Sequence, residues 1–195
     1  MAGALSDAKA QLRRAVLTAR EAMAPDTRVT AATRITAQIR SLDAWREARC
    51  VLGYLSFGSE IDTAALVGEV LAAGKTLCLP RVVRGERELA VQRVADLERD
   101  VQPGVFGIRE PREACAPVAL DAIDFVLVPG VAFTPRCDRL GYGGGYYDRL
   151  IARLAPRPPL VAAAFDLQLR EDIPLDTGDR RVDLVVTESA VHCGC

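Results

Sequence analysis

The chain has 195 residues, a formal net charge of −1, 50% hydrophobic residues and 26% charged residues. This balance is typical of a globular protein, and the length is enough to bury a large core. The near-neutral charge gives no reason to expect a nucleic-acid-binding surface, and no apolar stretch approaches the roughly 20 residues that cross a bilayer. Lys9, Arg13, Arg14 and Arg20 interrupt the apolar run that a signal peptide needs. We therefore expect a soluble, cytoplasmic protein with neither nucleic-acid nor membrane partners.

The first 42 residues predict two helices that pack on the rest of the domain. Ser6 can cap a first helix that ends near Met23, and Pro25 can open a second one. Lys9, Arg13 and Arg20 share one flank of the first helix. The expected apolar faces are Leu5, Ala8, Leu12, Val16, Ala19 and Met23 on the first helix, and Ala32, Ile35, Ile39 and Leu42 on the second. We expect Trp45 in the core.

The remaining chain alternates buried strands with helices. A helix is expected over residues 61–73, ended by Gly74. Strands are expected over residues 50–57, 75–81, 89–93, 125–128, 160–165 and 184–187. We find no internal repeat and no linker. The pattern predicts one α/β domain over residues 1–195, with a Rossmann-like, three-layer, open and mostly parallel sheet covered by helices on both faces.

The end of the chain contains two of the six cysteines, in the sequence His192-Cys193-Gly194-Cys195. This tail could bind a soft metal, but a fourth ligand is missing and chain ends are usually mobile. The other cysteines are scattered without zinc-ribbon spacing. We expect reduced thiols and a flexible tail from about residue 190 to 195.

The most informative segment runs from Arg139 to Asp148, Arg-Leu-Gly-Tyr-Gly-Gly-Gly-Tyr-Tyr-Asp. Leu150, Ile151 and Leu154 follow at helical spacing, so a glycine loop opens a helix. Such a loop directs several backbone amides toward one point at the positive end of a helix, which suits phosphate. An aspartate in the first helical turn could meet a metal carried by that phosphate.

Other interpretations of the glycine loop stay open at this point. It could be a tight turn that needs only positive φ angles. It is not a Walker loop, because no Gly-Lys-Ser/Thr ends it. It half matches a dinucleotide fingerprint, since Gly141-x-Gly143 is present and Asp166 follows about 20 residues on. Against that, Tyr146 stands at the third glycine position, and the loop does not directly follow its strand. Arg136, Arg139 and Arg149 around the loop favour a phosphate.

Segments along nearly the whole chain resemble the 5-formyltetrahydrofolate cyclo-ligase family, also called 5,10-methenyltetrahydrofolate synthetases. The most specific is the segment from Val128 to Asp148, Val-Pro-Gly-Val-Ala-Phe-Thr-Pro-Arg-Cys-Asp-Arg-Leu-Gly-Tyr-Gly-Gly-Gly-Tyr-Tyr-Asp. Four others support it: Lys9-x-x-x-Arg13, Phe57-Gly-Ser-Glu-Ile-Asp-Thr63, Phe106-Gly-Ile-Arg-Glu-Pro111, and Asp179-x-x-x-Asp183-Leu-Val-Val-Thr-Glu188.

The resemblance implies a magnesium-dependent ligase that uses ATP to convert 5-formyltetrahydrofolate to 5,10-methenyltetrahydrofolate, releasing ADP and phosphate. By resemblance, Lys9, Arg13 and Arg139 contact the nucleotide and take part in catalysis. The nucleotide contacts extend along the loop through Leu140, Gly141, Tyr142, Gly143, Gly144, Gly145, Tyr146 and Tyr147. The implied folate contacts are Leu55, Glu60, Gly144, Gly145, Tyr146 and Tyr147, and the implied magnesium ligands are Asp148 and Asp179.

Each implied role has a simpler interpretation. Lys9 and Arg13 could form a solvated helix edge, Asp148 could stabilise its helix as a first-turn acid, and Asp179 could be a turn residue. Glu60 could be a surface carboxylate, but it follows a strand, where open α/β sheets bind ligands. There it would accept hydrogen bonds from the amino-substituted pterin ring. Two aspartates suit magnesium, which keeps several waters.

One position departs from the family pattern, because Tyr142 stands where the family usually places an arginine. A phosphate-facing cation is therefore expected to be missing, and three consequences stay open: weaker ATP affinity, compensation by Arg136 or Arg149, or a shifted nucleotide preference. This departure favours an alternative, a catalytically idle ATP- or folate-binding protein on the same fold. A sugar-phosphate isomerase or acyl-CoA transferase is a third possibility, since similar open sheets serve all of them. We expect a monomer rather than an oligomer, with the two substrates as partners.

Overall fold

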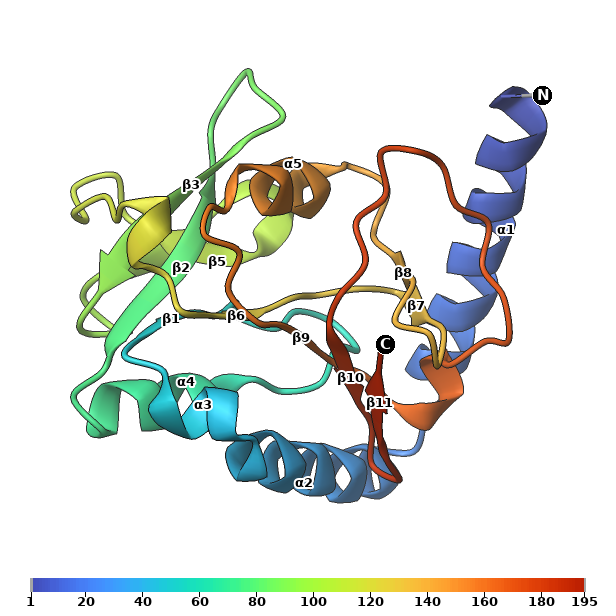
Figure 1. Cartoon of the computed structure of the whole chain (residues 1–195), viewed down its shortest axis with the longest axis horizontal. Helices are drawn as coiled ribbons and strands as arrows, with labels where there is room; N and C mark the ends of the chain where they lie inside the picture. Colours follow the sequence, from blue (N-terminus) through green and yellow to red (C-terminus); the bar gives the residue numbers. More distant parts are fainter. Residues whose placement is uncertain (1, 195) are drawn as a thin grey trace.

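The computed structural model describes residues 2–194, the side chains of residues 2 and 106 excepted. A seven-stranded sheet in the order β11-β10-β9-β6-β1-β2-β3 forms its centre (Figure 1). The strands are β1 (Cys50–Leu52), β2 (Thr76–Val82), β3 (Leu89–Val94), β6 (Phe125–Leu127), β9 (Leu160–Ala163), β10 (Leu184–Val186) and β11 (Val191–Cys193). The central strands β10, β9, β6, β1 and β2 are parallel, and the edge strands β3 and β11 are antiparallel.

Two hydrophobic clusters lie on opposite faces of this sheet, because successive strand residues point in opposite directions. Val51 faces the cluster that contains the helices α2 (Pro25–Ser41), α3 (Asp43–Glu47) and α4 (Ala64–Ala72). Leu52 faces the cluster that contains α5 (Tyr146–Arg153). Figure 1 shows α2, α3 and α4 below the sheet and α5 above it. The expected three-layer α/β architecture is confirmed.

Two small hairpins complete the fold. One pairs β4 (Val101–Pro103) with β5 (Arg109–Pro111), and the other pairs β7 (Ala132–Phe133) with β8 (Arg139–Leu140). The β7–β8 hairpin packs on the first helix, α1 (Ala2–Glu21), around Val16 and Leu140. Single turns of 3-10 helix lie at η1 (Val105–Gly107), η2 (Leu120–Ala122) and η3 (Asp166–Gln168). No helix of the described chain is long and apolar enough to span a membrane.

Most of the expected helices and strands are present, and several of them are shorter than expected. Pro25 opens α2, and Trp45 lies in the core, only 3% exposed, with its ring 5.2 Å from that of Phe125. Strand β1 ends at Leu52 instead of residue 57, because the following backbone leaves the sheet to form a wall of the site described below. Helix α1 begins before Ser6, which therefore lies inside the helix and does not cap it.

Residues 191–193 of the expected tail belong to the sheet. These residues form β11, which pairs antiparallel with β10, and Gly194 continues the contact by a hydrogen bond to the Asp183 carbonyl. The strand edge of β10 would otherwise leave its backbone groups unpaired, and the tail satisfies them. Cys195 lies outside the described residues.

Candidate active site

A cavity of about 380 Å³ opens at the carboxyl ends of β1 and β2. The chain runs from β1 outward to β2 and β3 on one side, and later from β6 to β9 and β10 on the other. The strand order therefore reverses between β1 and β6, and ligands of open α/β sheets bind at such a reversal. The cavity walls include Tyr54, Leu55, Phe57 and Glu60 after β1, Leu79, Pro80 and Val82 on β2, and Val105, Ile108, Arg109 and Glu110 from η1 to β5.

The glycine loop forms the opposite wall and leads into α5, as its sequence predicts. Gly145, with φ of 67°, precedes the helix, and Gly143 has φ of 102°. Both lie in the left-handed region, where side chains are strained. Gly144 is restricted differently, since a Cβ atom there would lie 2.7 Å from the Tyr146 ring. The first amides of α5 have no partner within the helix, so the loop offers donors to an anion.

Helix α1 presents a charged face to the site. Lys9 is 7% exposed and Arg20 is 3% exposed, whereas Ala8 and Ala19 of the expected apolar stripe are exposed. Of that stripe Val16 is buried, and Leu12 and Met23 are half-buried against hydrophobic clusters, so the predicted apolar face of α1 is only partly confirmed. The reason is that α1 packs on polar loops and the small β7–β8 hairpin, instead of on the apolar face of the sheet.

Lys9 lies between two carboxylates of the loop before β10. Its Nζ atom is 2.7 Å from Asp176 Oδ2 and 2.5 Å from Asp179 Oδ2. Burial alone would lower the pKa of Lys9, but hydrogen bonds and charges from both aspartates raise it. The Lys9 contact in turn holds the pKa of Asp176 below its usual range. Lys9 is therefore a fixed cation at this edge of the site.

Arg139 and Asp148 form an ion pair at the base of the glycine loop. The Arg139 side chain is 2% exposed and donates to Asp148 Oδ1, to the Arg180 carbonyl and to the Pro129 carbonyl. Asp148 Oδ1 also accepts the backbone N–H of Arg180 at 3.0 Å. Because residue 180 follows Asp179, this contact brings Asp148 and Asp179 to one edge of the site.

The acidic groups at that edge fit magnesium in their chemistry. Carboxylate oxygens are the ligands that this ion prefers, and it is usually held by one or two of them together with waters and phosphates. Among the described residues no group of three or more His, Cys, Asp or Glu side chains could hold a metal ion. A pair of aspartates that shares the ion with a nucleotide needs no such group.

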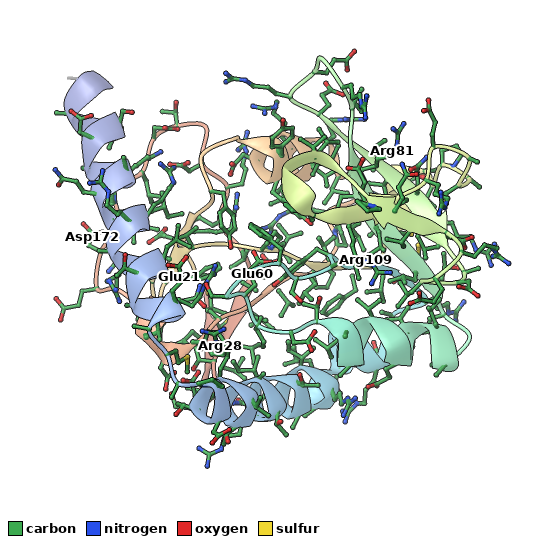
Figure 2. All side chains as sticks on the ribbon, turned by 180° about the vertical axis from the view of Figure 1, so that it is seen from behind. Glu21, Arg28, Glu60, Arg81, Arg109 and Asp172 are labelled. Carbon is green, nitrogen blue, oxygen red and sulfur yellow. The ribbon has the colours of Figure 1, made fainter. Side chains whose placement is uncertain are left out.

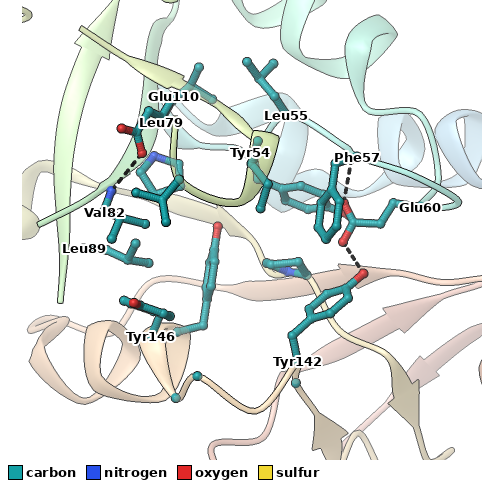
Figure 3. Close-up of a pocket in the computed structure, with 18 of the residues that line it drawn as sticks. Tyr54, Leu55, Phe57, Glu60, Leu79, Val82, Leu89, Glu110, Tyr142 and Tyr146 are labelled. Carbon is teal, nitrogen blue, oxygen red and sulfur yellow. Dashed lines mark hydrogen bonds between the residues drawn. The ribbon is translucent and has the colours of Figure 1, made fainter. Parts of the chain in front are cut away.

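Glu60 lies at the other side of the cavity and is 8% exposed. Its Oε1 accepts the Tyr142 hydroxyl at 2.5 Å, and its Oε2 accepts the Phe57 backbone N–H at 3.1 Å, as Figure 3 shows. Burial raises the pKa of Glu60, opposed by these hydrogen bonds and by the charge of Arg20. Figure 2 shows Glu60 inside the molecule, between α1 and the hairpin that bears Arg109.

Tyr142 points toward Glu60 and not toward the basic residues at the start of α1. Its ring lies 5.4 Å from that of Phe57, and its hydroxyl accepts a hydrogen bond from Arg20 Nη2 at 3.0 Å. The Tyr142 side chain therefore lies in the hydrogen-bond network of Glu60.

Tyr146 and Tyr147 both line the cavity. In Figure 3 the Tyr146 ring rises from the start of α5 and its hydroxyl points into the space. The Tyr147 hydroxyl is buried without a hydrogen-bond partner among the described residues, and burial raises the pKa of this phenol. A buried polar atom that lacks a partner costs free energy, so a ligand that supplies one would bind favourably.

Some of the remaining expected residues contact the glycine loop or line the cavity, and the side chains of the others lie elsewhere. Arg13 lies against the loop, with its Nε 2.8 Å from the Gly141 carbonyl. Leu55 lines the cavity, whereas the side chain of Leu140 is buried against α1, so only its backbone can face a ligand. Arg136 pairs with Asp172 and Asp138 instead of the glycine loop, and Arg149 donates to the Gly144 carbonyl at 2.7 Å.

Sequence reasoning missed Asp176, Ser59 and Tyr54 as parts of the site. It placed Arg20 on the same flank as Lys9 and Arg13 without giving it a role. The sequence could have indicated a role for Arg20, because the flank that it shares with Lys9 and Arg13 is the face of α1 that packs against the site. Asp176 could have been found from its spacing to Asp179, which places both carboxylates in one turn.

Comparisons with known proteins identify the family of the chain. The model of the 5-formyltetrahydrofolate cyclo-ligase family matches residues 5–188. A 5-formyltetrahydrofolate cyclo-ligase of Mycolicibacterium smegmatis is 30% identical over 92% of this chain and 93% of its own length. One of Escherichia coli K12 is 32% identical over 74% of this chain and 80% of its own length.

Solved structures give the same result. The NMR structure of Aquifex aeolicus 5,10-methenyltetrahydrofolate synthetase is 35% identical, covers 95% of this chain and 92% of its own, and superimposes with a TM-score of 0.84. The match of sequence and fold leads to one conclusion: the chain belongs to the 5-formyltetrahydrofolate cyclo-ligase family.

Proposed function

We propose that this protein closes the ring of 5-formyltetrahydrofolate to 5,10-methenyltetrahydrofolate, using ATP and Mg²⁺ and releasing ADP and phosphate. Family membership makes the protein a ligase of folate one-carbon metabolism that uses ATP. The proposal adds the metal, the residues and the order of chemical events.

The phosphate end of the site consists of Lys9, Arg13, the amides of the glycine loop, Asp148 and Asp179. Two cations, a helix N-terminus and two carboxylates lie along one edge, and together they can neutralise a magnesium triphosphate. Asp148 and Asp179 would hold the magnesium, which when bound would neutralise charge on the transferring phosphoryl group.

The folate end consists of the apolar cavity with Glu60 at its wall. Leu55, Leu79 and Val82 offer apolar faces to a flat heterocycle. Each Glu60 oxygen uses one lone pair on its present partner, which leaves acceptor sites for the N–H groups of a 2-amino-4-oxo pterin. A ring pinned in this way would direct its formyl group toward the glycine loop.

The chemistry needs positioning rather than a protein nucleophile. The formyl oxygen attacks the terminal phosphorus of ATP, and ADP leaves. Nitrogen 10 then attacks the formyl carbon and loses its proton, the carbon–oxygen bond breaks, and phosphate departs with both electrons. Lys9 and Arg13 would stabilise the charge that develops on the phosphoryl oxygens, while the cavity excludes water from the activated carbon.

The observation that carries this proposal is the junction of the two ends at Gly144, Gly145 and Tyr146. These loop residues line the apolar cavity and also form the N-terminus of α5. A phosphate held at that terminus therefore lies beside a group held in the cavity.

One assay tests the proposal: methenyltetrahydrofolate absorbance with 5-formyltetrahydrofolate and Mg²⁺, with and without ATP. We expect a signal that depends on both ATP and Mg²⁺. No ATP-dependent signal at high enzyme concentration would contradict it, and binding of both substrates without turnover would favour the idle binding protein instead.

The proposal includes a monomer that acts in the cytoplasm with its two substrates as its only required partners. Sedimentation of the purified chain at several concentrations checks the first point. A mass that rises with concentration to that of a dimer would contradict it.

A further inference from the structure

Arg20 occupies a place in the molecule that the proposed chemistry leaves unexplained. It is 3% exposed, although burying a guanidinium is costly unless it is paired and hydrogen-bonded. Its Nε donates to Ser59 Oγ at 2.9 Å, and its Nη2 donates to the Tyr142 hydroxyl at 3.0 Å. Ser59 precedes Glu60 in the wall after β1, and Tyr142 belongs to the glycine loop of the opposite wall and reaches across to Glu60.

These bonds form a chain from α1 to the cavity. Arg20 donates to the Tyr142 oxygen, and the Tyr142 hydroxyl donates to Glu60 Oε1 at 2.5 Å. The second Glu60 oxygen is fixed by the Phe57 N–H, and Ser59, which Arg20 also holds, is the residue before Glu60. Arg20 therefore fixes Glu60 from two directions, through its backbone neighbour and through its hydrogen-bond donor.

We propose that Arg20 is a positioning residue for the folate end: through Ser59 and Tyr142 it holds the Glu60 carboxylate in the orientation that receives the N–H groups of the pterin ring. The inference rests on the proposed function, in which Glu60 binds that ring. It also gives Tyr142 a role in folate binding that an arginine at this position could not fill, since a donor that also accepts a hydrogen bond is required.

The charges around Glu60 make the network testable by pH. Arg20 of α1 supplies a positive charge, while Tyr142 of the glycine loop, Tyr54 after β1 and Tyr147 of α5 are phenols. Burial raises the pKa of all three phenols, so they stay neutral near pH 7. Removing Arg20 therefore raises the pKa of Glu60 further, and the acidic limb of kcat/KM for 5-formyltetrahydrofolate moves to higher pH.

The experiment compares Arg20→Gln, Arg20→Lys and Tyr142→Phe with Arg14→Gln, which changes an exposed arginine of the same helix. For Arg20→Gln and Tyr142→Phe we expect the KM for 5-formyltetrahydrofolate to rise about tenfold, with the KM for ATP within about twofold. The acidic limb should move to higher pH in both variants. Arg20→Lys keeps the charge and should return the limb toward its original position, and Arg14→Gln should change nothing.

A purely structural role gives a different pattern. Equal effects on both KM values, or an acidic limb that stays in place in Arg20→Gln and Tyr142→Phe, would overturn the inference. If Arg20→Gln does not fold, Tyr142→Phe and Arg20→Lys decide the question by the same readouts. Calorimetric binding of 5-formyltetrahydrofolate without ATP separates the two proposals: weaker binding by Tyr142→Phe supports the network even if the wild-type enzyme shows no turnover, and unchanged binding overturns it.

Discussion

The phosphate end and the folate end differ in what their side chains already contact. At the phosphate end, Lys9 is paired with Asp176 and Asp179, and Arg139 is paired with Asp148. At the folate end, apolar walls surround a cavity of about 380 Å³, and Glu60 keeps acceptor sites that no described residue fills. The charged side chains of the phosphate end are thus already paired with one another, and the Arg139–Asp148 pair also lines the cavity where the two ends meet.

This difference has consequences for binding. Under the proposed function, a magnesium nucleotide would exchange internal ion pairs for new ones, so the energy of its charges would be partly offset by the pairs that it breaks. Folate would enter a preformed space and gain mainly from burial and from hydrogen bonds to Glu60. Substitutions at the phosphate end should therefore affect turnover most, and those at the folate end should affect KM.

Replacing Asp148 should have the largest effect. Asp148→Asn removes a charge from the proposed magnesium site, and we expect kcat to fall by about 100-fold. The assay is methenyltetrahydrofolate formation across a magnesium titration. Asp121→Asn, at an exposed carboxylate on η2, is the matched control. Unchanged kinetics at limiting magnesium would remove Asp148 from the metal site. Because Arg139 loses a partner, chemical denaturation must confirm that the variant is folded.

Replacing Lys9 should mainly weaken nucleotide binding. For Lys9→Met we expect the KM for ATP to rise about tenfold, since a charged contact to phosphate is lost. The KM for 5-formyltetrahydrofolate should stay within about twofold, because Lys9 does not line the apolar cavity. Arg14→Met on the exposed face of α1 is the control. A larger change in the folate KM than in the ATP KM would break the division into two ends.

Replacing Glu60 tests the folate end in the same way. Glu60→Gln keeps the shape but offers one acceptor in place of two, and we expect the KM for 5-formyltetrahydrofolate to rise about tenfold. The KM for ATP should change little. An increase in the ATP KM of the same size would show that Glu60 acts on the whole site.

Glu60→Gln should also change how the free energy of unfolding depends on pH. Burial raises the pKa of Glu60 in the folded protein. The stability that Glu60 contributes is therefore fully present below its unfolded pKa and is lost as pH rises through the folded pKa. Glu60→Gln removes this loss, so the variant should be more stable relative to wild type, with a larger free energy of unfolding, at about pH 7 than at about pH 4. Urea denaturation at both pH values checks this, and the opposite trend would contradict it.

A glycine substitution at the junction should have the smallest effect. A Cβ atom on Gly144 would lie 2.7 Å from the Tyr146 ring, so Gly144→Ala must move that ring. We expect kcat/KM for both substrates to fall about fivefold. Gly68→Ala in α4 meets nothing within 4 Å and should leave activity unchanged while slightly stabilising the helix. Equal activity of the two variants would show that the loop tolerates displacement.

Local patterns were enough to predict most of the fold. The run of glycines before Leu150 and Ile151 predicted the start of α5, and Pro25 predicted the start of α2, because both signals act within one turn of chain. Buried apolar runs predicted the parallel strands. The β11 strand could not be predicted in this way, since Val191–Cys193 is stabilised by pairing with β10 and not by its own composition.

The face of α1 shows the limit of periodicity. Leu12, Val16 and the alanines predicted an apolar stripe, but the helix turns its charged flank toward the site. Amphipathic analysis assumes that the partner surface is apolar. Here the partner carries Asp176, Asp179 and Tyr142, so charged side chains are buried in preference to alanine.

The sequence by itself determined the fold class and, through the motif from Val128 to Asp148, the resemblance to the cyclo-ligases, and it predicted a phosphate site at the glycine loop. Only the tertiary structure decided which charges meet. Lys9 and Asp179 lie 170 positions apart in the sequence, and Glu60 and Tyr142 lie 82 positions apart. Such contacts depend on how helices and loops pack around the sheet, which no local pattern encodes. For that reason the sequence suggested only that Tyr142 replaces a cation. In the folded protein the Tyr142 hydroxyl links Arg20 to Glu60 by two hydrogen bonds.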